Sequence, residues 1–333
     1  MKRQKIFLIL ILIGLVIPFI ISCDNQSNSY NINQIDLSLL NKIDLTRIYN
    51  ITDHLSSYRT RETGTFESAL AANDIHTILI DTFNLTDVFY EDFNYYETIC
   101  SNVVARINGT NLKDEIVIIS AHYDSISMSG DAPGANDNAV AVAACMEVIG
   151  IIQNNFILNR TLLFVSFSGE EQAFIGSYAW INLHKEELSK IVALINLDMI
   201  GYGKGLSIIK NDQSDWLADA IIHASSAVNV TFTKSNSPYP ENSRFDHDTF
   251  ILKQIPCVSL FESGIYPYYH TPDDTIDKIS FNLVEKCVQA TLMSVLYLGT
   301  LKFEHNWMIF SIIIWISWGI AAILPFLIYK KFK

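Results

Sequence analysis

An alternation of short apolar runs and helix-length segments constrains the fold of this chain more than any other feature. The apolar runs lie at 115–120, 161–168, 191–197, 205–210 and 256–261. Segments of helical length follow or separate them at 138–152, 175–188, 214–227, 245–253 and 281–300. Helical connections of this kind join parallel strands and cover both faces of a sheet. The sequence therefore predicts an α/β domain with a mostly parallel, mixed central sheet and helices on both faces.

The region upstream of this alternation is expected to complete the domain. Leu39–Tyr58 and Phe66–Ile80 carry apolar residues at helical spacing, whereas Asp87–Tyr96 alternates aromatic and polar residues as an outer strand does. Cys100–Ile107 is a further predicted strand. Residues 232–244 are polar and contain proline, so they are predicted to form a loop at the rim of a pocket.

Polar residues that can bind a metal follow four of the apolar runs or the turns after them. They are His122 with Asp137, the pair Glu170-Glu171, Asp198, and His270. The carboxyl ends of parallel strands share one edge of the sheet, so these side chains are expected to converge. Any one of these residues alone could have a purely structural role, as a helix cap, as part of a solvated turn, or as a histidine whose hydrogen bonds are all made within the protein. Their repetition favours a zinc site, because imidazole and carboxylate are zinc ligands.

The chain also resembles a known family through six motifs in order. These are AHYDS at 121–125, PGANDNA at 133–139, FSGEEQAFIGS at 167–177, NLDMIG at 196–201, FDH at 245–247 and YHTPDDT at 269–275. They resemble zinc peptidase family M28, which includes leucyl aminopeptidases, aminopeptidase Y, glutamate carboxypeptidase and glutaminyl cyclases. The resemblance covers residues 63–300 and implies a zinc aminopeptidase/phosphorylase-like fold.

The resemblance implies a role for each residue that matches a motif. Two zinc ions would be held by His122 with Asp198, by Glu171 with His270, and by Asp137 as the bridge. Glu170 would be the general base, and Asp124 would orient the His122 imidazole. Many members have Asp-Asp where this chain has Asp137-Asn138, but the first aspartate is the ligand. Asp246-His247 is read as support for the pocket.

These roles imply an aminopeptidase that acts on peptides with a free N-terminus. Tyr266 and Tyr268 are candidates for the pocket that receives the substrate side chain. The closest alternative is a glutaminyl-peptide cyclase, which shares the fold but works with one zinc. A non-catalytic receptor-like ectodomain is a second alternative, and loss of ligands would mark it. Carboxypeptidase action is a further possibility, although those relatives carry extra domains.

The N-terminal region is predicted to be a targeting segment. A basic start precedes the apolar run Ile6–Ile21, so residues 1–23 are expected to be a secretion or lipoprotein signal. Ile20-Ile21-Ser22-Cys23 resembles a bacterial lipobox, with Cys23 as the lipidated residue, and an uncleaved anchor is an alternative. Residues 24–38 are polar and predicted to be a linker to a peptidase domain over 39–303.

The C-terminal region is predicted to anchor the chain in a membrane. Trp307–Tyr329 contains no charged residue and is long enough to span a bilayer as a transmembrane helix. The basic tail 330–333 follows and is expected in the cytosol. The chain is therefore expected to be a single-pass protein of the cell membrane, with an extracytoplasmic catalytic domain.

The charge balance argues against nucleic acid as a partner. The chain has 23 basic and 35 acidic residues, and six of the basic ones lie near its two ends. The middle of the chain is therefore strongly acidic, whereas phosphate binding needs clustered lysine and arginine.

Overall fold

The computed structural model describes residues 37–237 and 245–300. The chain divides into two compact units, Met1–Gly299 and Thr300–Lys333, and nearly all described residues belong to the first. The predicted signal segment (1–23), the transmembrane helix (307–329) and the basic tail (330–333) lie outside the described residues, as does most of the predicted linker.

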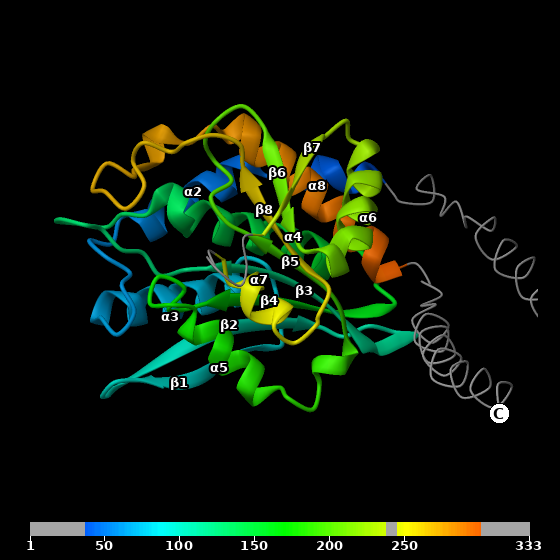
Figure 1. Ribbon diagram of the computed structural model, residues 1–333, viewed down its shortest axis with the longest axis horizontal. Coiled ribbons are helices and arrows are strands. Elements are labelled where there is room, and N and C mark those ends of the chain that lie inside the picture. The colour runs from blue at the N-terminus through cyan, green and yellow to red at the C-terminus, as the bar shows by residue number, and fades with distance from the viewer. Residues whose placement is uncertain (1–36, 238–244, 301–333) are drawn as a thin grey trace, which may run out of the picture. The chain divides into compact units, whose positions relative to one another are not determined.

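One eight-stranded mixed sheet forms the centre of the first unit, in the order β1-β2-β4-β3-β5-β8-β6-β7 (Figure 1). The strands are β1 (Val88–Tyr95), β2 (Thr98–Ile107), β3 (Leu112–His122), β4 (Arg160–Phe167), β5 (Ile191–Leu197), β6 (Leu206–Lys210), β7 (Phe232–Asn236) and β8 (Cys257–Glu262). The four central strands β4, β3, β5 and β8 run parallel. β1, β2 and β6 add antiparallel pairings, so the predicted mixed sheet is confirmed and its parallel part is central.

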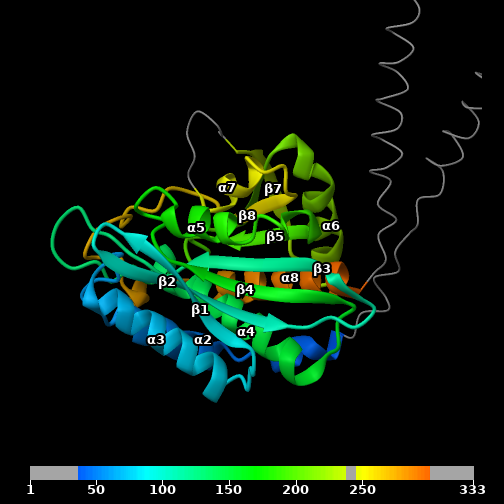
Figure 2. The same ribbon diagram turned by 90° about the horizontal axis from the view of Figure 1, so that it is seen from below.

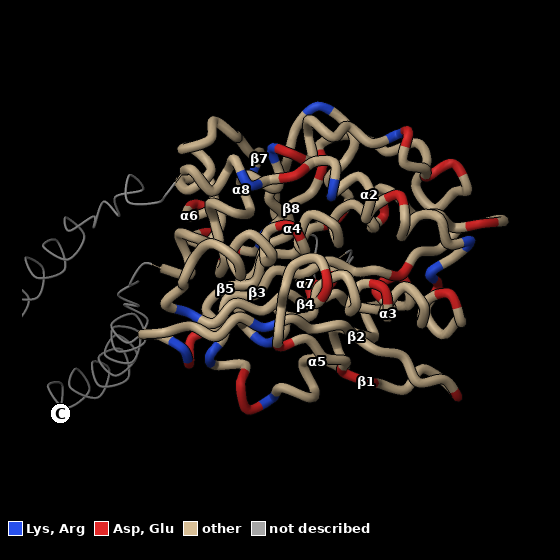
Figure 3. The backbone as a smooth tube through the Cα atoms, turned by 180° about the vertical axis from the view of Figure 1, so that it is seen from behind, with Lys and Arg blue, Asp and Glu red and all other residues tan. Residues whose placement is uncertain are grey.

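Helices cover both faces of this sheet. They are α2 (Leu45–Ser56), α3 (Phe66–Asp81), α4 (Val140–Asn155), α5 (Ile175–Leu183), α6 (Asp215–Ser226), α7 (His247–Ile251) and α8 (Phe281–Thr300). Figure 2 shows α3 and α4 on one side of the sheet and α5 and α7 on the other. Figure 3 shows acidic (red) and basic (blue) positions spread over loops and helices on the side seen there.

Helix α4 lies at the centre of one layer, and every residue from Val140 to Ile152 is buried. Together with the preceding turn it is the one helix among the described residues with the length and composition of a membrane span, and it is wholly covered by the domain. Its single charge, Glu147, accepts two hydrogen bonds from the Arg47 guanidinium of α2, at 2.7 and 2.6 Å. This pairing permits a carboxylate in an apolar helix. The predicted buried helix is confirmed.

An apolar cluster on the opposite face fixes the end of β4. Leu163, Val165 and Phe167 point to this face because side chains alternate along a strand. Phe250 of α7 packs against both Phe167 and Trp180 of α5, with ring centroids 6.2 and 5.7 Å apart. The end of β4, which Glu170 and Glu171 follow, is therefore held by aromatic packing.

The structure corrects several predicted boundaries. Phe232–Asn236, predicted as part of a loop, forms the edge strand β7 and pairs with β6. Most of its side chains are exposed, so no apolar alternation marked it, and its backbone pairing alone makes it a strand. The helix predicted over 175–188 ends at Leu183, and the one predicted over 245–253 is limited to His247–Ile251. The first predicted helix is divided into a 3-10 helix, Leu37–Lys42, and α2.

Candidate metal centre

The central strands deliver the predicted ligands to one edge. β3 ends at His122, which is paired in register with Phe167, the last residue of β4. β5 ends at Leu197, opposite Leu260 of β8, and Asp198 follows directly. Because the four parallel strands end side by side, residues far apart in sequence meet at their carboxyl ends.

His122, Asp137 and Asp198 form the more buried part of the cluster. The Nε2 atom of His122 lies 3.2 Å from Asp137 Oδ1 and 3.6 Å from Asp198 Oδ2. All three side chains are at most 5% exposed. Their ligand atoms lie within 4.8 Å of one another, which suits a single metal ion.

Asp137, Glu171 and His270 form the second part, which is nearer to solvent. His270 Nε2 lies 3.3 Å from Asp137 Oδ2 and 3.0 Å from Glu171 Oε1. The two oxygens of Asp137 therefore face one histidine each. The five predicted ligands form two overlapping groups that share Asp137, and each group offers one imidazole nitrogen and carboxylate oxygens, a donor set that fits zinc.

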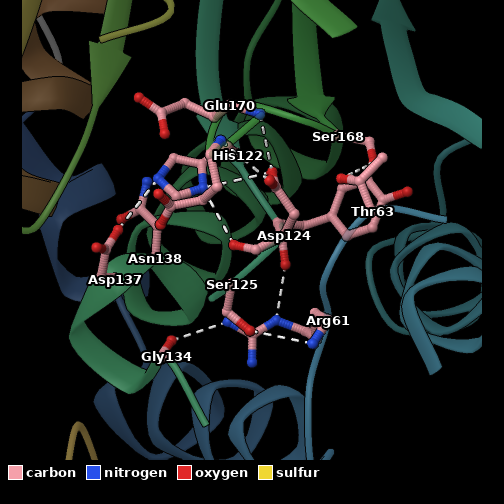
Figure 4. Close-up of polar contacts among 12 residues, drawn as sticks. Arg61, Thr63, His122, Asp124, Ser125, Gly134, Asp137, Asn138, Ser168 and Glu170 are labelled. Carbon is pink, nitrogen blue, oxygen red and sulfur yellow. Dashed lines mark hydrogen bonds and ion pairs between the residues drawn. The ribbon is translucent and has the colours of Figure 1, made fainter. Parts of the chain in front are cut away.

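The Asp124 carboxylate connects His122 to the glutamate pair. It accepts a hydrogen bond from the backbone N–H group of Glu170 (Figure 4) and one from that of Glu171, both at 3.2 Å. Its Oδ1 atom lies 3.6 Å from His122 Nδ1, while the backbone oxygen of Asp124 is nearer to that nitrogen, at 3.2 Å. Asp124 therefore fixes the turn that carries both glutamates as well as lying beside the imidazole.

Asp274 holds the turn that carries Asp137, a contact that the sequence analysis missed. Its carboxylate accepts hydrogen bonds from the backbone N–H groups of Asn136 and Asp137, at 2.8 and 3.0 Å. The Tyr266 hydroxyl donates to the same carboxylate at 2.6 Å. The available signal was its place in the motif YHTPDDT, four residues after His270.

The contacts of Asn138 explain why an asparagine can stand where the resemblance led us to expect a second aspartate after Asp137. Its Nδ2 donates to the backbone oxygen of Leu197 at 3.0 Å, and its Oδ1 accepts from the Met199 N–H at 3.1 Å. These two backbone groups flank Asp198. An amide can donate and accept at the same time, whereas an ionised carboxylate can only accept. Asn138 is therefore suited to hold the segment that presents Asp198.

A further buried carboxylate, Glu262, lies behind the Asp137 turn. It accepts two hydrogen bonds from Asn136 Nδ2, at 3.1 and 3.0 Å, and one from the Tyr202 N–H at 2.5 Å. Burial raises the pKa of Glu262 to about 7, although these donors favour its ionised form. Glu262 thus links the end of β8 to the turn that carries the bridging aspartate.

The glutamate pair is strongly perturbed by its surroundings. Burial raises the pKa of Glu170 well above its usual range; His122 opposes this, and the carboxylates of Glu171 and Asp198 add to it. Burial also raises the pKa of Glu171 to about 8, and Asp137 adds to the shift. Carboxylates gathered at one buried place repel each other, and a bound cation removes that repulsion.

The histidines respond in the opposite sense. Burial lowers the pKa of His270, but hydrogen bonds to Asp137 and Glu171 outweigh it and raise the pKa to about 10. Burial also lowers the pKa of His122, but Glu170 and Asp198 together with hydrogen bonds to Asp124 and Asp137 raise it well above its usual value. The carboxylates of the cluster therefore favour a positive charge on both imidazoles.

Asp246 and His247 are fully buried and belong to neither ligand group. Among the described residues, the oxygens of the Asp246 carboxyl and both ring nitrogens of His247 have no hydrogen-bond partner. Burial raises the pKa of Asp246 to about 7 and lowers that of His247 to about 4. His247 is therefore neutral at pH 7, and Asp246 is protonated far more readily than an exposed aspartate. Their place outside the two ligand groups that share Asp137 agrees with support of the site and not ligation.

A cavity of about 790 Å³ opens onto the cluster. Apart from the metal-ligand set its walls are largely apolar, formed by Phe174, Met199, Ile209, Phe245, Phe261, Ile265 and Tyr266. Asn236, at the end of β7, also lines it, so part of the predicted rim segment does border the pocket. Tyr268 is not among the lining residues; it packs against Tyr266 with ring centroids 5.6 Å apart.

Comparison with known sequences gives matches that cover this site. The sequence pattern of peptidase family M28 matches residues 102–295. Endoplasmic reticulum metallopeptidase 1 of Mus musculus is 25% identical over 309 residues, covering 82% of this chain and 33% of that protein. Leucine aminopeptidase 1 of Arthroderma otae is 31% identical over 200 residues, covering 54% and 53%. The chain thus spans about a third to a half of the length of these relatives.

Solved structures show the same fold. LapB from Legionella pneumophila superimposes with a TM-score of 0.70 at 23% sequence identity, over 79% of this chain and 74% of that one. At this identity the likeness concerns the arrangement of the sheet and helices alone.

Proposed function

The chain belongs to peptidase family M28, and from this premise we propose that it is an extracytoplasmic, membrane-anchored dizinc aminopeptidase. It would remove N-terminal residues from peptides. The family match covers more than half of the chain and spans all five proposed ligands. The relatives named as leucine aminopeptidases and as a metallopeptidase support the same activity.

One observation carries the proposal of two metals. Asp137 presents Oδ1 to His122 and Oδ2 to His270, at 3.2 and 3.3 Å. A carboxylate that faces a separate imidazole with each oxygen is placed to bridge two ions. Asp198 completes one group and Glu171 the other. A cyclase with a single zinc would need only one of these groups.

Glu170, Asp124 and the metal ligands would have different roles in the reaction. Zinc ions bound here would supply Lewis acidity, which lowers the pKa of a water molecule and polarises the scissile carbonyl. Glu170 is 8% exposed at the wall of the cavity. It lies close to His122 and Glu171 in a third possible ligand group, but the two groups that share Asp137 are complete without it. It would accept the proton of the attacking water and donate it to the leaving amine. Asp124 would hold Glu170 in place through the backbone N–H.

The cavity supports a preference for apolar N-terminal side chains. Phe174, Phe245 and Phe261 line it, and its charged lining residues are those of the metal cluster. A charged substrate side chain would lose its hydration there without gaining a partner. Peptides that begin with leucine or phenylalanine are therefore the proposed substrates.

Hydrolysis of a panel of aminoacyl-amides by the full chain in detergent tests this function. We expect turnover of the leucine and phenylalanine substrates at least about tenfold faster than of the glutamate substrate, since a charge buried without a partner costs several kcal/mol. Zinc analysis should give two ions per chain. One zinc together with cyclisation of an N-terminal glutamine would instead identify a glutaminyl-peptide cyclase. Two zincs without any turnover would favour a receptor-like ectodomain.

The membrane attachment is a separate part of the proposal. It is supported by the uncharged stretch 307–329 and the lysines after it, both outside the described residues. A chain truncated before Trp307 should be soluble and active, because all proposed ligands precede that point. In intact cells an impermeant protease should cleave the catalytic domain and spare the tail 330–333. Sedimentation of the truncated chain with membranes would move the anchor to the N-terminal segment.

A further inference from the structure

Arg61 lies in the segment between α2 and α3, and its side chain is completely buried. Its Nε donates to the backbone oxygen of Tyr123 at 2.7 Å, and its Nη2 donates to that of Gly134 at 2.8 Å. Nη1 donates to the backbone oxygens of Leu55 and Pro133, at 2.8 and 2.5 Å. Figure 4 shows the guanidinium below the cluster, beside Gly134 and Ser125. Every hydrogen-bond acceptor of this guanidinium among the described residues is a backbone carbonyl.

Three of the four carbonyls that Arg61 binds belong to the two segments that present His122 and Asp137, and the fourth, that of Leu55, belongs to α2. Tyr123 directly follows His122, and Gly134 lies three residues before Asp137. Gly134 has a φ of 54°, and a Cβ there would lie 2.9 Å from Arg61 Nη2 and 2.4 Å from the backbone oxygen of Asp137. The backbone of the Asp137 turn is therefore pressed against the guanidinium with no room for a side chain.

The guanidinium also places a positive charge beneath the acidic cluster. Burial lowers the pKa of Arg61 to about 10, while the charges of Asp274, Asp124, Asp137 and Glu171 oppose this. Arg61 therefore remains positive at neutral pH. None of those carboxylates binds it directly, so its field acts on the cluster as a whole.

We propose that Arg61 is a positioning residue of the metal centre, which ties the His122 strand end to the Asp137 turn and offsets the charge of the ligand carboxylates. This inference rests on the proposed function. The planar fork of arginine directs several N–H groups at fixed angles, whereas a lysine offers one ammonium group at the end of a flexible stem. Arg61→Lys therefore keeps the charge and loses the fork.

Arg160 offers a matched control at the other end of the sheet. It is also buried, and it donates to Glu115 Oε2 at 2.7 Å and to the backbone oxygen of Leu298 at 2.8 Å. It begins β4, whereas the metal cluster lies beyond the end of that strand. Arg160→Lys should therefore weaken packing without affecting zinc.

The experiment measures zinc affinity by competition with a chromogenic chelator in the full chain, wild type, Arg61→Lys and Arg160→Lys. We expect Arg61→Lys to raise the zinc dissociation constant by roughly 10–100-fold, the range for groups that orient metal ligands. Arg160→Lys should stay within about threefold of wild type, although the metal-free forms of both variants melt at lower temperature. If the two variants have the same zinc affinity as each other, whether weakened or not, the inference is overturned and Arg61 is a packing residue.

A milder variant keeps the test usable if Arg61→Lys does not fold. The Ser125 hydroxyl accepts from the Arg61 backbone N–H at 3.0 Å and donates to the backbone oxygen of Ala132 at 2.7 Å. Ser125→Ala removes the hydrogen bond that fixes the Arg61 backbone beside the cluster, so it should weaken zinc binding by up to about tenfold, the lower end of that range. Unchanged zinc affinity in Ser125→Ala would count against the inference. A wild-type chain that binds no zinc would instead refute the proposed function.

Discussion

The amino ends and the carboxyl ends of the central strands form two opposite borders of the sheet, here called the amino edge and the carboxyl edge. The two differ in how their charges are balanced. At the amino edge, Arg160 is paired with Glu115 at 2.7 Å, and the Thr161 hydroxyl donates to the backbone oxygen of Lys113 at 2.8 Å. At the carboxyl edge, Asp137, Glu170 and Asp198 lie together with few cations nearby. Opposite charges stabilise the first edge, whereas like charges at the second are tolerated only with bound protons or metal.

The backbone shows the same difference. Four of the eight described non-glycine residues with positive φ lie beyond the carboxyl ends of central strands. They are Ala173, Phe174, Met199 and His270, with φ between 47° and 63°. A left-handed conformation costs roughly 1–2 kcal/mol for such residues. Backbone strain and repulsion between carboxylates are therefore concentrated at the carboxyl edge, where the site lies, and the rest of the sheet stabilises the fold.

The largest expected effect is on turnover. Glu170→Gln at the carboxyl edge should lower kcat by about a thousandfold, the scale of general-base catalysis, while zinc content stays at the wild-type level. Glu115→Gln, the same change at the amino edge, should leave kcat within about twofold, because Glu115 contacts only Arg160 among these charged groups. Loss of zinc from Glu170→Gln would mean that Glu170 is a ligand.

The next effect is on metal affinity. Asn138→Ala removes both hydrogen bonds that hold the backbone beside Asp198, so zinc affinity should fall by roughly 10–100-fold in a chelator competition assay. The control is Asn111→Ala, which removes an exposed amide that donates to Asn159 Oδ1 at 2.8 Å near the amino edge. Its zinc affinity should equal that of wild type. Equal losses in the two variants would contradict the difference between the edges.

A smaller effect concerns pH and the metal-free protein. Burial raises the pKa of Glu171 to about 8 and of Asp198 to about 6, above their unfolded values of 4.5 and 3.8. Their protonated forms favour the folded state, so this stability is full below the unfolded pKa and is lost as pH rises through the folded pKa. The pKa of His270 is raised from 6.5 to about 10 by carboxylates that outweigh its burial, so its contribution is full below pH 6.5 and is lost as the pH rises through 10.

Thermal unfolding between pH 5 and 8 measures this loss. The metal-free protein should lose at least about 2 kcal/mol, which corresponds to at least ~4 °C in Tm for a domain of this size. The zinc-loaded protein should change much less, because the bound cations favour the ionised carboxylates. A metal-free Tm that rises with pH over this range would contradict the assignment of the carboxyl edge as the site of repulsion.

The smallest effect tests whether charges near the carboxyl edge affect the stability of the fold only when they are buried. Arg59 and Asp131 form an ion pair at 3.2 Å in the loops beside the site, with side chains 79% and 58% exposed. Asp131→Asn should change Tm by less than about 2 °C, because water and salt screen an exposed pair. A larger change, measured by calorimetry against wild type, would show that exposed charges near the site are also coupled to stability.

The predictions were most accurate for elements that are buried in the domain. The strand predicted over 191–197 and the helix predicted over 281–300 have those bounds in the structure. Both carry continuous or periodic apolar residues because they are buried, and burial is what leaves a pattern in sequence. β7 left no such pattern, since an edge strand with exposed side chains is determined by its pairing with β6.

From the amino-acid sequence alone, the order of the strands and helices other than β7 could be predicted, together with the residue types that stand at the strand ends. Both depend on local periodicity and on motifs of a few residues. Only the tertiary structure decided the contacts that hold the site: Asp274 binds the Asp137 turn across 137 residues, and Arg61 binds Gly134 across 73. Such hydrogen bonds depend on where the folded backbone brings distant carbonyl and N–H groups, and no local pattern records that distance.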